Sequence, residues 1–251
     1  MDAMSVIITS FHQKDFTINC VKSYLYFCPI GFKLNLIVVE NSDDISYKNE
    51  VLGMGGNITW VNNPTLYRGA NANANGIEFG MKYVKDDYVF LSHNDICIAS
   101  SNFFTSLSEK VKCGYQLVGT CFDIEPLRNY SIIVLGCLVK SDIVRSVDLY
   151  PFGGPPENHY YECGDRIHLY CRENNIPWFC FNNTHNNKEL QSVLKEPYNS
   201  LLYTVITIDD YEQVIFLHFA RGTDKTNNRY KKSGRLTLSQ IIEFCNNIFS
   251  K

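Results

Sequence analysis

Residues 88–98 read YVFLSHNDICI, and this stretch decides the fold that the sequence predicts. Its first four residues form a short apolar run, which is typical of a buried strand. The run then ends abruptly in the polar residues Ser92, His93, Asn94 and Asp95. The pattern therefore predicts a buried strand whose end carries several hydrogen-bond acceptors.

Three earlier segments repeat this pattern of an apolar run that ends in polar residues. They lie at 5–9 (SVIIT), 34–39 (LNLIVV) and 58–61. Between them, 15–27 and 69–84 show the apolar periodicity of helices. Strands that alternate with helices indicate βαβ units. We therefore predict an α/β fold with a mainly parallel central sheet flanked by helices.

The second half of the chain changes character but keeps both kinds of element. Its apolar patterns predict strands at 117–120, 132–139, 178–181 and 214–219, and helices at 164–173 and 236–249. We expect all the strands to join one continuous sheet. The sequence therefore predicts a single domain over 1–251.

The composition is that of an ordinary globular protein. Of 251 residues, 45% are hydrophobic and 20% charged, and a net charge of −3 gives no overall sign of a nucleic-acid partner. The ten cysteines include no C-x-x-C pair, and several lie in apolar runs, which favours free thiols in a reducing compartment. The start MDAMSVIITSFHQ lacks the features of a secretion signal, and no apolar run is long enough to span a membrane. We expect a cytoplasmic protein.

Polar residues follow each of the four N-terminal strands. In an open α/β sheet, ligands bind beyond the carboxyl ends of the strands. The residues at these ends are Ser10, Phe11 and His12, then Glu40, Asn41 and Ser42, then Asn63 and Arg68, and finally His93, Asn94 and Asp95. Their convergence predicts a site for a polar ligand. The sequence contains no Walker loop and no G-x-G-x-x-G, which argues against a P-loop or classical dinucleotide site.

Four segments, in order, resemble the motifs of GT-A glycosyltransferases, family 2 above all. That family has, in order, VIIPTYN, VVDNGS, an Asn/Gly helix start and a strand ending in Asp-x-Asp. The corresponding segments of this sequence are VIITSFHQ, LIVVENSDD, NNPTLYRGANANANGI and DDYVFLSHNDICI. The resemblance covers about the first 100 residues well and the remainder loosely. It implies a GT-A fold that transfers a sugar from a nucleotide-diphosphate donor to an acceptor hydroxyl, with Mn²⁺ or Mg²⁺ as cofactor.

The resemblance also divides the chain into functional parts. It implies a nucleotide-sugar-binding half over about 1–100 and an acceptor and catalytic half, with a basic loop, over about 101–235. The remainder, 236–251, is the C-terminal helix.

The resemblance assigns the metal to two residues. Asp95 matches the last acid of the Asp-x-Asp motif, and carboxylate oxygens suit Mg²⁺ and Mn²⁺. His93 or Asn94 stands in place of the first acid, so the contacts of that acid are in question. His218 follows an apolar strand and matches the C-terminal histidine that binds the metal in many GT-A enzymes. The alternatives are a turn-capping acid and a structural histidine at a strand end.

The same resemblance predicts a set of residues that bind the nucleotide-sugar. Aromatic rings can stack on a base, and acceptors can bind its imide or the ribose hydroxyls, while a helix start favours anions. Ordinary turn chemistry and helix initiation are the alternatives. The predicted residues are Ser10, Phe11, Glu40, Asn41, Arg68, Asn73, His93, Asn94, Arg221 and Lys225.

The catalytic base is predicted within 161–166, which read YECGDR. Inverting transfer needs a carboxylate that removes the proton from the acceptor hydroxyl. In the family this base lies in an E-D-x-D-like segment that opens a helix, and Cys163 stands at its central acid. We expect Asp165 to be the base, with Glu162 as the second candidate. The alternative is an acid that complements the dipole of the helix.

A basic run follows the strand predicted at 214–219. Asp224 alone opposes its six cations, which are Arg221, Lys225, Arg229, Lys231, Lys232 and Arg235. Many enzymes of the family cover the donor diphosphate with a mobile basic loop, which we expect here. A solvated surface is one alternative. Another is contact with anionic lipid head groups, which would place the protein peripherally at a membrane.

The sequence leaves rival functions open. A retaining transferase would use the same donor site, and the altered Asp-x-Asp motif is compatible with a catalytically silent nucleotide- or glycan-binding relative. Sugar nucleotidyltransferases normally carry a Gly-rich, Lys/Arg-containing loop after the first strand, and 10–14 do not supply one. The favoured hypothesis is an inverting transferase with a UDP-sugar donor and a glycan or lipid-linked acceptor, acting in synthesis of a surface polysaccharide or glycoconjugate.

Overall fold

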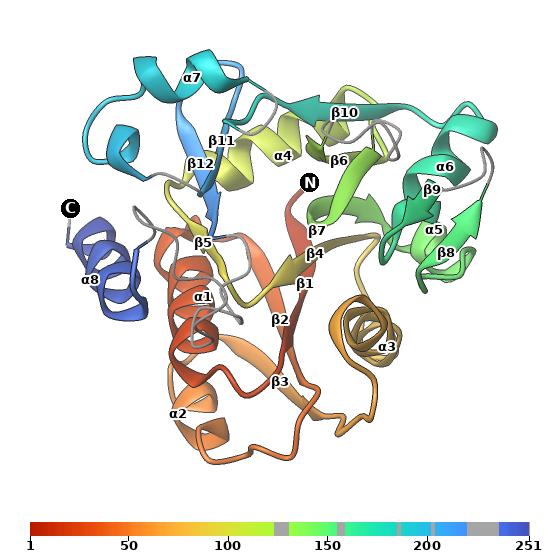
Figure 1. The fold of residues 1–251 in the computed structure, drawn as a ribbon, viewed down its shortest axis with the longest axis horizontal. Helices are drawn as coiled ribbons and strands as arrows, with labels where there is room; N and C mark the ends of the chain where they lie inside the picture. The colour runs from red at the N-terminus through yellow and green to blue at the C-terminus, as the bar shows by residue number, and fades with distance from the viewer. Residues whose placement is uncertain (123–130, 155–158, 185–186, 202–203, 220–235, 251) are drawn as a thin grey trace.

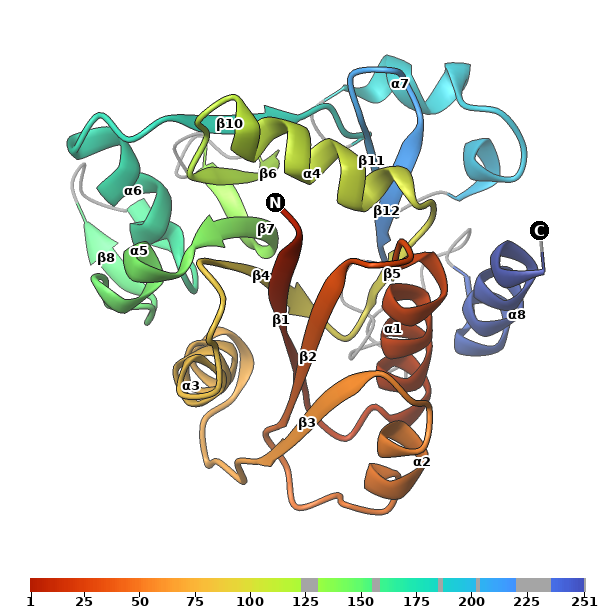
Figure 2. The ribbon, with the colours of Figure 1, turned by 180° about the vertical axis from the view of Figure 1, so that it is seen from behind.

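The computed structural model describes residues 1–122, 131–154, 159–184, 187–201, 204–219 and 236–250. A seven-stranded sheet forms its centre, and two smaller sheets and the helices surround it (Figures 1 and 2). The strands of the central sheet are β1 (Ala3–Ser10), β2 (Lys33–Glu40), β3 (Asn57–Asn62), β4 (Tyr88–His93), β6 (Leu117–Phe122), β7 (Ser131–Lys140) and β10 (Trp178–Phe181).

The central sheet is mainly parallel, as the alternation of strands and helices predicted. Its order is β10-β6-β7-β4-β1-β2-β3. β1 pairs in parallel with β2 and β4, β2 with β3, and β6 with β10. Only β7 runs antiparallel to its neighbours among these strands of the described chain. The carboxyl ends of the other six strands therefore lie at one edge of the sheet.

The strand register aligns the polar residues that follow the N-terminal strands. Ser10 at the end of β1 is level with Glu40 on β2, and Glu40 is level with Asn62 on β3. On the other side of β1, Thr9 is level with His93 on β4. The convergence expected from the sequence is therefore present in the backbone.

Helices cover both faces of the central sheet. α1 (Lys14–Phe27), α2 (Lys48–Leu52) and α4 (Asn102–Lys112) contribute to one apolar core, while α3 (Gly69–Met81), α5 (Ser141–Arg145) and α6 (Asp165–Glu173) contribute to the other. Successive residues of a strand point to opposite faces, so Val6 and Ile8 lie in the first core and Ile7 in the second. This two-sided burial explains the continuous apolar runs of the strands.

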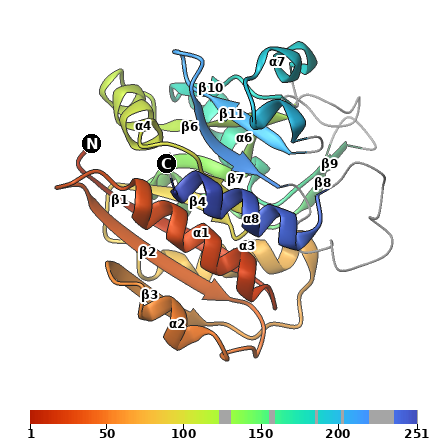
Figure 3. The same cartoon turned by 90° about the vertical axis from the view of Figure 1, so that its left-hand side faces the viewer.

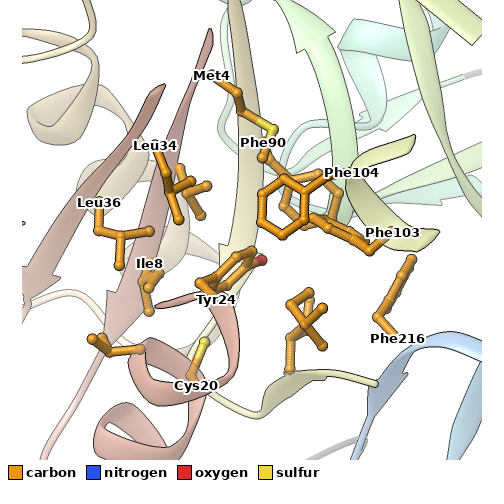
Figure 4. Packing of buried hydrophobic residues seen from close by; sticks show 14 of the residues in the cluster. Met4, Ile8, Cys20, Tyr24, Leu34, Leu36, Phe90, Phe103, Phe104 and Phe216 are labelled. Carbon is orange, nitrogen blue, oxygen red and sulfur yellow. The ribbon is translucent and has the colours of Figure 1, made fainter. Parts of the chain in front are cut away.

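Aromatic rings fill the first core where α1 and α4 meet the sheet. Tyr24 lies among Phe90 and Phe103, with ring centroids 6.3 and 5.9 Å away, and Phe216 reaches the same cluster (Figure 4). The Tyr24 hydroxyl donates a hydrogen bond to Ser92 Oγ, next to the end of β4. The core therefore fixes the strand end that carries His93.

The small sheet corrects the expectation of one continuous sheet. β12 (Val214–His218) lies between β11 (Val205–Ile208) and β5 (Ile96–Ile98), antiparallel to both. The reason is a two-residue turn at 94–95, through which the chain leaves the central sheet after β4 and enters β5. The C-terminal helix α8 (Leu238–Phe249) packs beside α1 and against this small sheet (Figure 3).

The remaining elements lie at the periphery. They are a hairpin of β8 (Phe152–Gly154) and β9 (His159–Tyr161), the helix α7 (Lys188–Val193) and a short 3₁₀ turn at Tyr198–Ser200. Within the described ranges, no helix has both the length and the apolar character needed to cross a bilayer.

Candidate functional site

Three potential metal ligands lie close together where the central sheet meets the small sheet of β11, β12 and β5. His93 ends β4, Asp95 lies in the turn before β5, and His218 ends β12. Their ligand atoms all lie within 4.8 Å of one another. His218 Nε2 is 3.3 Å from Asp95 Oδ1, and His93 Nδ1 is 3.8 Å from the same oxygen. The structure thus brings together the two residues predicted to bind metal and one predicted to bind the donor.

Backbone pairing explains why His218 lies beside Asp95, although the two are far apart in sequence. His218 is level with Ile96 in the pairing of β12 with β5. One residue further along, the amide of Phe219 donates to the carbonyl oxygen of Asp95 at 3.0 Å. The small sheet therefore positions the third ligand.

Asn94, the residue between His93 and Asp95, turns into the protein. Its amide nitrogen Nδ2 donates to Ser10 Oγ at 3.3 Å and to Thr17 Oγ1 at 3.2 Å, and the side chain is buried. These contacts fix the turn to β1 and α1. The structure thus gives Asn94 a structural contact, and its predicted role in donor binding stays a prediction.

The electrostatics of His93 suit a metal ligand. Burial, reinforced by His218 and opposed by Asp95, lowers the pKa of His93 to about 4. The ring is therefore neutral at pH 7, as a metal-binding imidazole must be. Its Nε2 atom is buried, and no hydrogen-bond partner for it exists in the part of the chain that the structure describes. Two imidazoles and a carboxylate at these distances are a donor set that fits a divalent cation.

Glu40 lies fully buried beneath the loop that follows β1. Its Oε1 atom accepts hydrogen bonds from the amides of Ser42 at 2.9 Å and His12 at 3.2 Å. Its Oε2 atom accepts one from the hydroxyl of Tyr47, which also lies 3.0 Å from Ser10 Oγ. Glu40 and Ser10, both predicted to bind the nucleotide, therefore hold the loops at the ends of β1 and β2 together.

Asn41 links the end of β2 to α3. Its side-chain amide donates to the carbonyl oxygen of Ala72 at 3.0 Å, and its Oδ1 accepts from Asn63 Nδ2 at 2.8 Å. Gly76 allows this approach, because a Cβ atom there would lie 2.7 Å from Asn41 Nδ2. In this structure Asn41 is buried, and its hydrogen bonds join the loops after β2 and β3 to α3.

Phe11 and Arg68, two of the predicted donor-binding residues, lie next to each other. Phe11 is partly buried and Arg68 exposed, and the guanidinium carbon lies 4.9 Å from the centroid of the Phe11 ring. Asn73, on the first turns of α3, accepts a long hydrogen bond of 3.5 Å from Thr9 Oγ1. A cation stacked on an aromatic ring at the strand ends is an arrangement that can bind a base and a phosphate.

The two candidate bases lie at the start of α6. This helix precedes β10, and β10 runs in the same direction as β4. The N-terminus of the helix therefore lies at the carboxyl edge of the sheet. Asp165 is buried, and its Oδ2 accepts from the amide of Glu162 at 2.7 Å. Glu162 is partly exposed. Gly164 has a φ of 74°, a conformation that favours glycine and makes the turn into the helix.

Some predicted residues lie outside the part of the chain that the structure describes. These are Arg221 and Lys225, together with the other four cations of the basic run at 221–235.

Comparisons with solved structures identify the fold. The mannosyltransferase PcManGT from Pyrobaculum calidifontis, in complex with GDP-Man and Mn²⁺, matches 70% of this chain and 54% of its own, with a TM-score of 0.54 and 10% identity. S. aureus TarS matches 79% of this chain and 41% of its own, with a TM-score of 0.51 and 11% identity. The chain has the GT-A fold. The GT-A fold predicted from the four motifs is therefore confirmed.

No family model matches this GT-A chain, and no curated protein matches it. The chain covers 54% of PcManGT and 41% of TarS.

The sequence did not reveal every residue that builds the site of this GT-A chain. Tyr47 and Thr17 complete the hydrogen bonds around Ser10, and neither was predicted. His93 was predicted to bind the donor, and the structure also places it in a cluster with Asp95 and His218. The available signal was its spacing, since His93 stands two residues before Asp95 where a first acid would stand.

Proposed function

We propose that this protein is a metal-dependent glycosyltransferase that moves a sugar from a nucleotide-diphosphate donor to an acceptor hydroxyl. The observation that carries the proposal is the cluster of His93, Asp95 and His218 at the carboxyl edge of a GT-A sheet. Ligands of open α/β sheets bind at that edge. The similar fold of PcManGT, a mannosyltransferase in complex with GDP-Man and Mn²⁺, supports the same assignment.

Asp95 and His218 would hold the divalent cation, Mn²⁺ or Mg²⁺, at this cluster. Such an ion would neutralise the negative charge that develops on a departing nucleotide diphosphate. Asp95 would contribute the hard oxygen, and the β5–β12 pairing fixes its backbone beside that of Phe219. We further propose that the donor is a UDP-sugar. Arg221, Lys225 and the rest of the basic run would cover its diphosphate.

Nucleotide recognition falls to Phe11 and Arg68. The Phe11 ring can stack on a base, and the Arg68 guanidinium, which covers that ring, can move onto a phosphate. Ser10, Glu40 and Asn41 act by holding the loops that carry Phe11 and the start of α3. This assignment places donor binding in about 1–100, although His218 comes from the acceptor half of about 101–235.

Asp165 takes the proton of the acceptor hydroxyl as its oxygen bonds to the anomeric carbon, and the bond to the nucleotide diphosphate breaks on the opposite face, so that the configuration is inverted. Its support is the position of the α6 N-terminus at the carboxyl edge of the sheet. Glu162 is the second candidate, since it is the more exposed of the two carboxylates. Comparison of kcat for Asp165→Asn and Glu162→Gln identifies the base, and NMR of the product anomer tests inversion. A base assignment to Asp165 is wrong if Asp165→Asn retains the wild-type kcat.

A thermal-shift screen of nucleotide-sugars, with and without Mn²⁺, tests the function. We expect a UDP- or GDP-linked donor to raise the Tm of the wild type only with metal, and Asp95→Ala to lose the effect. Asp95→Asn, which keeps the shape of the side chain, guards against a folding defect. Asp43→Asn is the matched control, because the Asp43 side chain is exposed and its carboxylate lies outside the cluster. Equal stabilisation without metal, or by Asp95→Asn with metal, contradicts the proposal.

One observation favours a second function, a catalytically silent nucleotide- or glycan-binding relative. His93 stands where the resemblance places the first acid of Asp-x-Asp. Metal-dependent hydrolysis of a UDP-sugar, even if slow, would exclude the silent relative. A glycan or lipid-linked acceptor, and a role in surface polysaccharide or glycoconjugate synthesis, follow from the resemblance and are tested by acceptor screening once a donor is known.

A further inference from the structure

The donor atoms of the cluster differ from those of an Asp-x-Asp site. His93 and His218 offer two imidazole nitrogens, and Asp95 offers one carboxylate. An Asp-x-Asp motif would instead offer oxygens from both acids. The difference bears on which ion the site prefers, because metal ions differ in their affinity for nitrogen and oxygen.

The side chain of His93 is held at the cluster by its surroundings. The side chain is only 18% exposed, and its ring centroid lies 5.9 Å from that of His218. Cys20, on α1, donates from Sγ to the His93 carbonyl oxygen at 3.5 Å, and so ties this residue to the core. The backbone of His93 is therefore anchored to α1, and its ring is largely enclosed.

The buried Nε2 atom of His93 needs an explanation. Among the described residues it has no hydrogen-bond partner. A buried polar atom left without a partner costs about 1–3 kcal/mol, so native structures seldom keep one without a functional reason. Nδ1 is the ring nitrogen that faces Asp95, so with an ion on Nδ1 the buried Nε2 would carry the proton of the neutral ring.

We propose that this centre selects a first-row transition ion over Mg²⁺, with His93 as a metal ligand together with Asp95 and His218. Imidazole suits Zn²⁺, Fe²⁺ and Co²⁺, whereas Mg²⁺ prefers oxygen ligands and retains its waters. Affinity should therefore rise from Mg²⁺ to Mn²⁺ and from Mn²⁺ to Co²⁺. The inference rests on the proposed function only in placing a cation at Asp95.

The distances agree with one ion among the three side chains. For metal–ligand distances of about 2.0–2.2 Å, neighbouring ligand atoms lie about 2.8–3.6 Å apart. The separation of His218 Nε2 from Asp95 Oδ1, 3.3 Å, falls in this range, and that of His93 Nδ1 from the same oxygen, 3.8 Å, lies just above it. Three protein ligands leave further positions for the oxygens of a diphosphate.

Binding of metal ions alone, without nucleotide, tests the proposal. Titration calorimetry of the wild type with Mg²⁺, Mn²⁺ and Co²⁺ should give one Co²⁺ site whose Kd is at least about tenfold lower than that for Mg²⁺. Bound Co²⁺ should show visible absorption bands that change in His93→Asp. That variant restores the Asp-x-Asp pattern, so we expect it to bind Mg²⁺ more tightly and Co²⁺ more weakly than the wild type.

The controls separate this inference from a folding defect and from the proposed function. Asp142→Asn removes an exposed carboxylate outside the cluster and should leave both affinities unchanged. His218→Asp makes the same donor exchange at the other histidine and serves if His93→Asp does not fold. Equal Kd values for Mg²⁺ and Co²⁺, or an unchanged Co²⁺ affinity in His93→Ala, overturn the proposal. Selective Co²⁺ binding without any sugar transfer supports it and counts against the proposed function alone.

Discussion

Removal of the Tyr47 hydroxyl is the sharpest test of how the nucleotide-side loops are held. In the structure this hydroxyl donates to Glu40 Oε2 and lies 3.0 Å from Ser10 Oγ. The Tyr47 ring packs edge-on against Trp60, with centroids 5.0 Å apart. Tyr47→Phe keeps that ring packing and removes only the polar group, so the loss reports on the hydrogen bonds.

The magnitude follows from the burial of both partners. Glu40 and Tyr47 are each 0% exposed. Burial first, and then the hydrogen bond to Glu40, raise the pKa of Tyr47, so the hydroxyl keeps its proton as a donor. A hydrogen bond to a charged group contributes about 1.5–3 kcal/mol, and a neutral one about 0.5–1.5 kcal/mol. We therefore expect Tyr47→Phe to lower the free energy of unfolding by about 2–4 kcal/mol.

Urea unfolding of four proteins measures this loss and its origin. They are the wild type, Tyr47→Phe, Glu40→Gln and the double variant, whose coupling energy isolates the pair. Tyr211→Phe is the matched control, because Tyr211 is 68% exposed. A loss below about 0.5 kcal/mol in Tyr47→Phe, or strict additivity of the two single changes, would refute the reasoning.

Two further predictions concern titration and close packing. Burial lowers the pKa of both His93 and His168 from 6.5 to about 4, so in acid the unfolded chain binds protons that the folded chain does not. The free energy of unfolding should be highest above pH 6.5 and should fall between pH 6.5 and 4, by up to about 3 kcal/mol for each histidine. Urea unfolding across this range measures the change, and a free energy that does not vary with pH would contradict the prediction. Gly76→Ala should destabilise the fold by about 1–3 kcal/mol, because the new Cβ would lie 2.7 Å from Asn41 Nδ2. Gly153→Ala should have little effect, because among the described residues, its two chain neighbours apart, no atom lies within 4 Å of the new Cβ. Equal thermal midpoints for the two variants would contradict the packing argument.

The N-terminal strands could be predicted because their sequence signal is local. β1, β2 and β4 are buried on both faces, so each is a continuous run of apolar residues that no helix period explains. α4 was not predicted, although Phe103, Leu107 and Val111 follow one another at four-residue spacing. That signal was present in the sequence, and the helix could have been predicted from it.

β5 is a different case, because its three residues carry no signal of their own. Ile96–Ile98 form a strand only through pairing with β12, which lies more than a hundred residues further along the chain. Pairing over such a separation depends on tertiary packing, which local pattern cannot report. The expectation that β12 would join the central sheet was wrong for the same reason.

The site shows the same division between local and distant causes. The resemblance identified Asp95 and His218 separately, but only the β5–β12 pairing puts His218 Nε2 3.3 Å from Asp95 Oδ1. Glu40 was predicted to bind the nucleotide from its place after β2. Nothing in that local sequence reveals that Tyr47, seven residues later, folds back to donate to its carboxylate.

The two ends of the site are connected through one continuous set of hydrogen bonds. Glu40 binds Tyr47, Tyr47 lies against Ser10, and Ser10 accepts from Asn94, the residue between two of the candidate metal ligands. Asn94 also forms the turn that carries the chain from the central sheet into β5. The loop that would contact the base and the turn that would hold the cation therefore share one buried support. A change at Tyr47 should for this reason weaken metal binding as well as stability, although Tyr47 itself contacts none of the three ligands in any interaction that the structure describes.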